Sequence, residues 1–155
     1  MNGLLNSPGL LGTNAPFRID LTLILILVSA VLFRTGWILA IRKRYEAHRW
    51  VQTSAVILST LVILFTMVSS FLIHILPGIP GKLNQGDYAL TTLHAIVGLV
   101  GMLLGVFIVL RANKLVPKAL RFRNYKLFMR TSYALYMLAT FGGVIVYITV
   151  YVYGI

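Results

Sequence analysis

The sequence predicts an all-α membrane protein, a four-transmembrane-helix bundle with its N-terminus and C-terminus outside. Three observations predict this. Of the 155 residues, 59% are hydrophobic and only 11% are charged, whereas soluble domains carry about 25% charged residues. The apolar residues gather in four long runs, at about 19–41, 51–76, 89–110 and 132–153. The basic residues gather in alternate connections between these runs.

Each run is long enough to cross a bilayer as a helix. About 20 helical residues span a hydrocarbon core about 30 Å thick. Because backbone N–H and C=O groups find no water there, each run is expected to satisfy them within a helix. We therefore divide the chain into an external N-terminal tail, 1–18, and one transmembrane domain, 19–155. The tail lacks a basic start and a small-residue cleavage site, so we interpret it as a mature tail and not as a signal peptide.

The basic residues predict the orientation of the bundle. Eleven of the 14 Lys and Arg residues lie in 42–50 and 111–131, the first and third connections. Positively charged connections stay in the cytoplasm, so both are predicted to be cytoplasmic in a multi-pass protein of the cell membrane. In this setting the net charge of +11 indicates contacts with anionic membrane lipids and not with nucleic acid.

The sequence contains no constellation of side chains typical of an enzyme. It has no cysteine, which excludes disulfides, zinc–thiolate sites and iron–sulfur clusters. We find no nucleophile-and-base pair, Gly-rich phosphate loop or metalloprotease motif, so we predict no catalytic residue and no soluble small-molecule substrate. We also expect no acidic side chain to be buried within a span, which argues against a proton pump or a proton-coupled transporter.

Two histidines are the candidate ligands of a cofactor or metal. His74 ends the second run and His94 lies near the start of the third, so both are expected at similar depth on the outer side. Consecutive helices are usually neighbours, and paired imidazoles on facing helices hold haem iron or a metal ion. Met67 precedes His74 by seven residues and is a weaker candidate copper ligand, because methionine is more often a packing residue. The alternative is that each histidine bonds headgroups, water or backbone and binds nothing.

Three glycines follow His94 on one helical face, at Gly98, Gly101 and Gly105. Such a face either leaves a groove for a flat macrocycle or lets another helix pack closely, and helix packing is the commoner use.

Two further polar residues are weaker candidates. Arg34 lies inside the first run; it is expected either to extend past Trp37 to the cytoplasmic interface or to pair with a carboxylate or haem propionate. His48 begins the second run on the cytoplasmic side. It cannot share a site with His74, because their separation of 26 residues corresponds to about 39 Å of helix.

Several short motifs also occur in a particular order. The motifs are His48-Arg49, Ser70-Phe71 before His74, Leu93-His94, Asn124-Tyr125-Lys126, and then Gly143, Tyr147 and Tyr151. From about residue 19 to the C-terminus, this pattern resembles the YozB/CtaM-like family of four-helix prokaryotic membrane proteins. That family is mostly uncharacterised and includes an assembly factor for the haem–copper cytochrome aa3 oxidase.

The resemblance implies a prokaryotic cell membrane and a respiratory or photosynthetic membrane complex as partner. It also implies a second histidine pair at the cytoplasmic face. The position that matches the fourth histidine of the family is Phe128 here, so the resemblance leaves His48 without an imidazole partner.

Three functional hypotheses follow. The first is an assembly or maturation factor for a haem–copper respiratory oxidase, which handles haem or copper through His74 and His94. The second is a b-type cytochrome, in which these two histidines are permanent axial ligands of one haem near the outer face. The third is an accessory subunit of a large respiratory or photosynthetic complex that contains no cofactor. None of the three is an enzyme by itself.

Overall fold

The computed structural model of the protein describes residues 7–117 and 124–154. Its long helices are α1 (Phe17–Ile41), α2 (Tyr45–Val62), α3 (Gly86–Ala112) and α4 (Tyr125–Tyr147). Short helical segments extend two of them. Two π-helical segments and a 3-10 turn continue α2, as η1 (Ile63–Val68), η2 (Phe71–Ile75) and η3 (Leu76–Gly78), and the π-helical η5 (Ile148–Val152) continues α4.

Four helical stretches are long and apolar enough to cross a membrane. They are Phe17–Ile41, Tyr45–Gly78, Gly86–Ala112 and Tyr125–Val152. The predicted all-α bundle of four transmembrane helices is therefore confirmed within the described residues.

All four helices begin before the predicted apolar spans, by two to seven residues. Helix α1 begins at Phe17, inside the predicted tail 1–18, and α2 begins at Tyr45 and not at 51. Helix α4 begins at Tyr125 and not at 132. Hydropathy identifies only the apolar part of a helix. The backbone hydrogen bonding of the helix continues into the membrane interface, where long basic side chains reach water. Arg49, Lys126 and Arg130 therefore lie on helices and not in loops.

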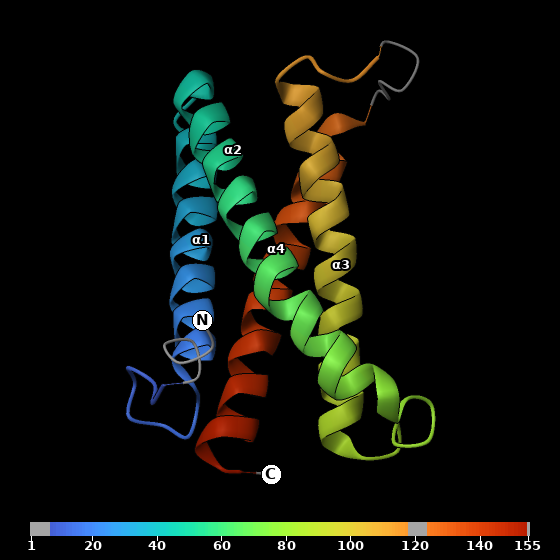
Figure 1. The fold of residues 1–155 in the computed structure, drawn as a ribbon. Coiled ribbons are helices and arrows are strands. Elements are labelled where there is room, and N and C mark those ends of the chain that lie inside the picture. The colour runs from blue at the N-terminus through green and yellow to red at the C-terminus, as the bar shows by residue number, and fades with distance from the viewer. Residues whose placement is uncertain (1–6, 118–123, 155) are drawn as a thin grey trace.

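The second span is the longest and crosses the bundle at an angle. Its 34 residues correspond to about 51 Å of helix, well beyond a hydrocarbon core of about 30 Å. A helix that exceeds the bilayer thickness accommodates the excess by tilting. In Figure 1, α2 starts beside α1 and ends, through its green extension, beside the first turns of α3.

The four helices form two antiparallel pairs, α1 with α2 and α3 with α4, which meet along α1–α4 and α2–α3 contacts. The buried core lies where these pairs meet. It comprises Phe33, Ala55, Val56 and Tyr136. The rings of Phe33 on α1 and Tyr136 on α4 lie 4.3 Å apart between centroids, which joins the two pairs.

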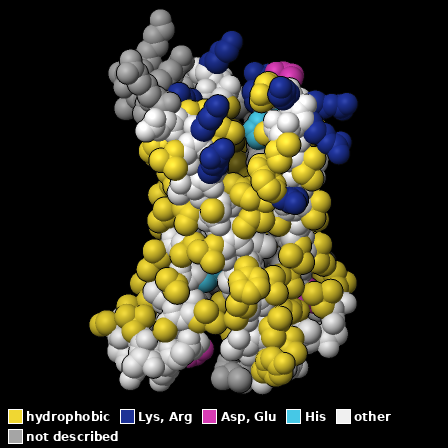
Figure 2. Space-filling view, turned by 180° about the vertical axis from the view of Figure 1, so that it is seen from behind, with side chains coloured by type: hydrophobic (Ala, Val, Ile, Leu, Met, Phe, Trp, Pro, Cys, Tyr) yellow, Lys and Arg dark blue, Asp and Glu magenta, His cyan; other side chains and the backbone are white. Residues whose placement is uncertain are grey.

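The two ends of the bundle differ in charge. The end that carries the α1–α2 and α3–α4 connections is called here the basic end, and the end where the chain starts and finishes the terminal end (Figure 1). Figure 2 shows the Lys and Arg side chains gathered at the basic end. Its described residues are Arg42, Lys43, Arg44, Arg49, Arg111, Lys114, Lys126 and Arg130. The cytoplasmic position of this end remains a prediction from its charge.

Candidate functional site

A polar network closes the terminal end of the bundle. Asp20, in the first turn of α1, has a fully buried side chain. Its Oδ1 accepts a hydrogen bond of 2.6 Å from the Tyr147 hydroxyl of α4, and its Oδ2 accepts one of 2.8 Å from the Leu11 backbone N–H. The Tyr147 oxygen also bonds Thr13 Oγ1 at 2.7 Å. Residues from the tail, from α1 and from α4 are thus held together around one carboxylate.

This arrangement corrects the expectation that no acidic side chain is buried within a span. A carboxylate is stabilised at a helix N-terminus, where the backbone N–H groups carry partial positive charge. The chain also makes room for it, since a Cβ atom at Gly9 would overlap the Asp20 carboxylate and the Ala15 carbonyl. The acid is therefore a structural centre of hydrogen bonding in this part of the protein.

His94 lies between the paired helices α3 and α4. Its ring is half-buried against two adjacent glycines of α4, and a Cβ atom at Gly143 would lie 3.1 Å from Cε1 of the imidazole. A Cβ atom at Gly142 would lie 3.4 Å from Nδ1. These glycines form a cradle that admits the flat ring between two helix backbones.

One nitrogen of this imidazole has an unusual environment. The Nδ1 atom of His94 is buried and has no partner of good hydrogen-bond geometry within the described part of the chain, but the Ala139 backbone lies close enough to the ring to serve as its hydrogen-bond partner. Buried polar atoms are nearly always hydrogen-bonded. The Ala139 backbone is therefore the nearest partner for this imidazole, which is held between α3 and α4.

The other predicted ligand has a different environment. His74 lies on η2 and is exposed on the surface of the bundle, while Met67 on η1 is half-buried. No hydrogen bond of the described residues joins His74 to His94, although η2 and α3 are in contact. The shared ligand site of the two histidines remains a prediction.

The glycine face of α3 is covered by α4. A Cβ atom at Gly101 would lie 3.3 Å from that of Leu135, and one at Gly105 would lie 2.7 Å from Cε2 of Tyr136. Gly98 is looser, because the Ala139 methyl would be 4.0 Å away. Side chains of α4 thus fill the space that a macrocycle would need on this face, and a haem does not fit there. Of the two predicted uses of these glycines, the structure favours helix packing.

The two weaker candidates make local contacts near the basic end. The guanidinium of Arg34 is exposed and lies 4.3 Å from the centre of the Trp37 ring, as expected if its side chain extends along Trp37 toward the interface. The Nδ1 atom of His48 is 2.7 Å from the Gly36 carbonyl oxygen of α1, so His48 links α2 to α1.

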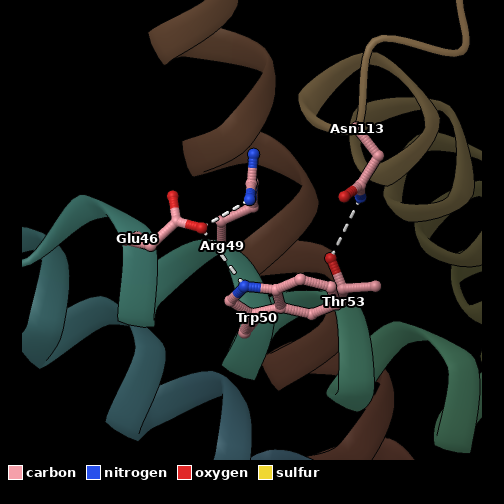
Figure 3. Close-up of polar contacts among 5 residues, drawn as sticks. All are labelled: Glu46, Arg49, Trp50, Thr53 and Asn113. Carbon is pink, nitrogen blue, oxygen red and sulfur yellow. Dashed lines mark hydrogen bonds and ion pairs between the residues drawn. The ribbon is translucent and has the colours of Figure 1, made fainter.

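Sequence analysis missed two sets of polar contacts at the basic end, one within α2 and one between α2 and the end of α3 (Figure 3). Glu46 accepts hydrogen bonds from Arg49 at 2.5 Å and from Trp50 Nε1 at 3.2 Å, all on one helix. The Nδ2 atom of Asn113, which follows α3, donates to Thr53 Oγ1 of α2 at 3.2 Å. The spacing of Glu46, Arg49 and Trp50 at three and four residues is a signal that could have predicted the first set.

No group of three or more His, Cys, Asp or Glu side chains is placed to hold a metal ion in the described ranges. Compared with known protein families, curated proteins and solved structures, the chain has no significant match.

Proposed function

We propose that this protein is an integral membrane assembly or maturation factor for a haem–copper respiratory oxidase, and that any metal it handles is cargo and not a resident cofactor. The observation that carries this proposal is the ordered set of motifs that resembles the YozB/CtaM-like family. Some of these motif residues contact one another across helices, since His94 of α3 lies against Gly143 of α4. Residues from separate motifs thus take part in one packing arrangement.

The surroundings of the two histidines suit transient binding better than permanent binding. A bis-histidine haem site fixes both imidazoles on facing helices, but here His94 is packed in its glycine cradle and His74 is exposed. Imidazole nitrogen suits copper and other transition metals. We infer that a cuprous ion contacts the exposed His74 first and the imidazole of His94 second, before it passes to a partner.

The b-type cytochrome hypothesis is weakened by the filled glycine face. The accessory-subunit hypothesis is favoured by a different observation, the many large apolar side chains that stay exposed, such as Phe65 at 75% and Ile73 at 62%. Such side chains suit lipid as well as the helices of a larger complex. A cofactor-free accessory subunit is therefore the second candidate function.

Deletion of the gene in its own host tests the proposal. Membranes of the deleted strain should lose terminal oxidase activity and the absorption of the oxidase haems, and the wild-type gene should restore both. His94→Phe keeps a flat ring between the glycines but cannot bind a metal, so it should restore neither. The matched control is His48→Phe at the opposite end, which should restore both.

Purified protein separates the two candidate functions. Cuprous ion supplied in a competition assay should bind wild-type protein, and binding should fall at least tenfold in the His74→Ala, His94→Phe double variant. Normal oxidase levels in the deleted strain would refute the assembly role. Stable co-purification with a large complex, unaffected by either histidine substitution, would instead establish the accessory subunit.

A further inference from the structure

A lateral groove separates α2 from α3 toward the basic end. Its volume is about 550 Å³, and exposed lining residues such as Ile57 and Leu115 show that it opens to the outside of the bundle. Apolar side chains form most of its wall, with polar groups at Thr53, Thr60 and Asn113. The apolar lining residues are Val56, Ile57, Leu61, Val106, Val109, Leu110 and Leu115.

The tilt of α2 creates this groove. Helix α2 packs along α1 near the basic end, and its extension η2 meets α3 near the terminal end (Figure 1). The two axes therefore diverge toward the basic end. The hydrogen bond from Asn113 Nδ2 to Thr53 Oγ1, 3.2 Å long, bridges the gap there (Figure 3).

An interfacial tryptophan marks the depth of the groove. Trp50 lies on α2 three residues before Thr53, is 58% exposed, and donates its Nε1 hydrogen to Glu46. Tryptophan side chains of this kind lie at the level of lipid headgroups. The apolar part of the groove, from Val56 to Leu61 on α2, therefore lies at the level of the acyl chains.

The groove lies toward the strongly positive end of the bundle. The basic end carries eight described basic residues, and its one acid, Glu46, is already paired with Arg49. Lys114 is exposed and stands next to Asn113 in the chain, directly before the lining residue Leu115. Basic pockets between transmembrane helices bind the headgroups of anionic lipids.

We propose that this groove is a binding site for an anionic phospholipid. One acyl chain lies along the apolar wall between α2 and α3, and the phosphate lies near Asn113 and Lys114. A helix of a partner protein fits less well. It is about 10–12 Å across, and it could not lie along the groove without breaking the Asn113–Thr53 bridge, whereas a single acyl chain can pass beside it.

Fluorescence quenching in vesicles tests this proposal. In a Trp37→Phe background, Trp50 is the only tryptophan, so its quenching reports lipid near the groove. Acyl-brominated phosphatidylglycerol, at equal mole fraction in phosphatidylcholine vesicles, should quench Trp50 more strongly than brominated phosphatidylcholine does. Lys114→Asn should lower this preference about fivefold, the contribution of one basic side chain at a membrane surface.

The chain offers matched controls for both parts of the site. Lys43 follows α1 as Lys114 follows α3, and both adopt positive φ, 59° and 64°, a conformation that asparagine tolerates. Lys43→Asn should keep the preference for phosphatidylglycerol. Ile57→Phe, which fills the groove, should abolish it. Ile96→Phe should leave it unchanged, because Ile96 has a similar exposure, 56% against 53%, and lies outside the groove.

Three results would overturn the proposal. Equal quenching by the two brominated lipids would show that no anionic lipid is selected. Equal loss in Lys114→Asn and Lys43→Asn would assign the preference to the surface charge as a whole. If Ile57→Phe kept the lipid preference but abolished co-purification of a protein partner, the groove would be a helix-docking site. Far-ultraviolet circular dichroism and monodisperse elution of each variant would verify folding.

Discussion

Removal of one hydroxyl, in Tyr147→Phe, should destabilise the terminal end of the bundle. The Tyr147 side chain is 7% exposed, and its hydroxyl donates to Asp20 Oδ1 at 2.6 Å. Because that single proton goes to Asp20, Thr13 donates to the Tyr147 oxygen, at 2.7 Å. The substitution removes both bonds and leaves a fully buried carboxylate with one fewer donor. A hydrogen bond to a charged group contributes about 1.5–3 kcal/mol, so we expect a loss of stability of this size.

Two measurements check this prediction. The free energy of unfolding, from titration of detergent-solubilised protein with a denaturing detergent, should fall by about 1.5–3 kcal/mol. Hydrogen exchange should rise locally at the Leu11 amide, which donates to Asp20 Oδ2 at 2.8 Å. Tyr153→Phe is the control, because Tyr153 is 72% exposed. A loss below about 0.5 kcal/mol, with unchanged exchange at Leu11, would refute the role of Tyr147 as the link between the tail, α1 and α4.

Two further predictions concern helix packing. Gly105→Ala places a methyl group 2.7 Å from Cε2 of Tyr136 and should reduce the free energy of unfolding by about 1–3 kcal/mol through overpacking. Gly98→Ala, in looser surroundings, should change it by less than about 0.5 kcal/mol. The same unfolding titration compares the two variants, and equal effects would contradict the close packing of α3 against α4. His48→Ala removes the 2.7 Å bond to the Gly36 carbonyl and should lower the free energy of unfolding by about 0.5–1.5 kcal/mol. Cuprous-ion binding, measured by the competition assay on the same samples, should not change.

The overall fold could be predicted because its main physical cause is visible in the linear sequence. Apolar runs too long for a soluble core require transmembrane helices, since an unpaired backbone group costs several kcal/mol in lipid. The helix ends could not be placed in this way. At Tyr45 and Tyr125 the helices begin among polar and basic residues, where hydropathy is low but helical hydrogen bonding is still favourable.

The surroundings of the candidate site were much less predictable. The partner of Asp20 is Tyr147, which is 127 residues away in the chain, and no local pattern joins them. Glycine spacing did identify the packed face of α3. It could not say what covers that face, because the rotation of α4 that places Tyr136 against Gly105 depends on packing along the whole helix pair.

The two histidines of the proposed site lie in helices that are packed differently. His94 belongs to the α3–α4 pair, which close contacts at Gly101, Gly105 and Gly143 hold in one register. His74 belongs to the far extension of α2, where two π-helical segments interrupt the regular hydrogen bonding. Such segments are frequent at functional sites. The regular packing around His94 thus contrasts with the irregular helical segment that carries His74.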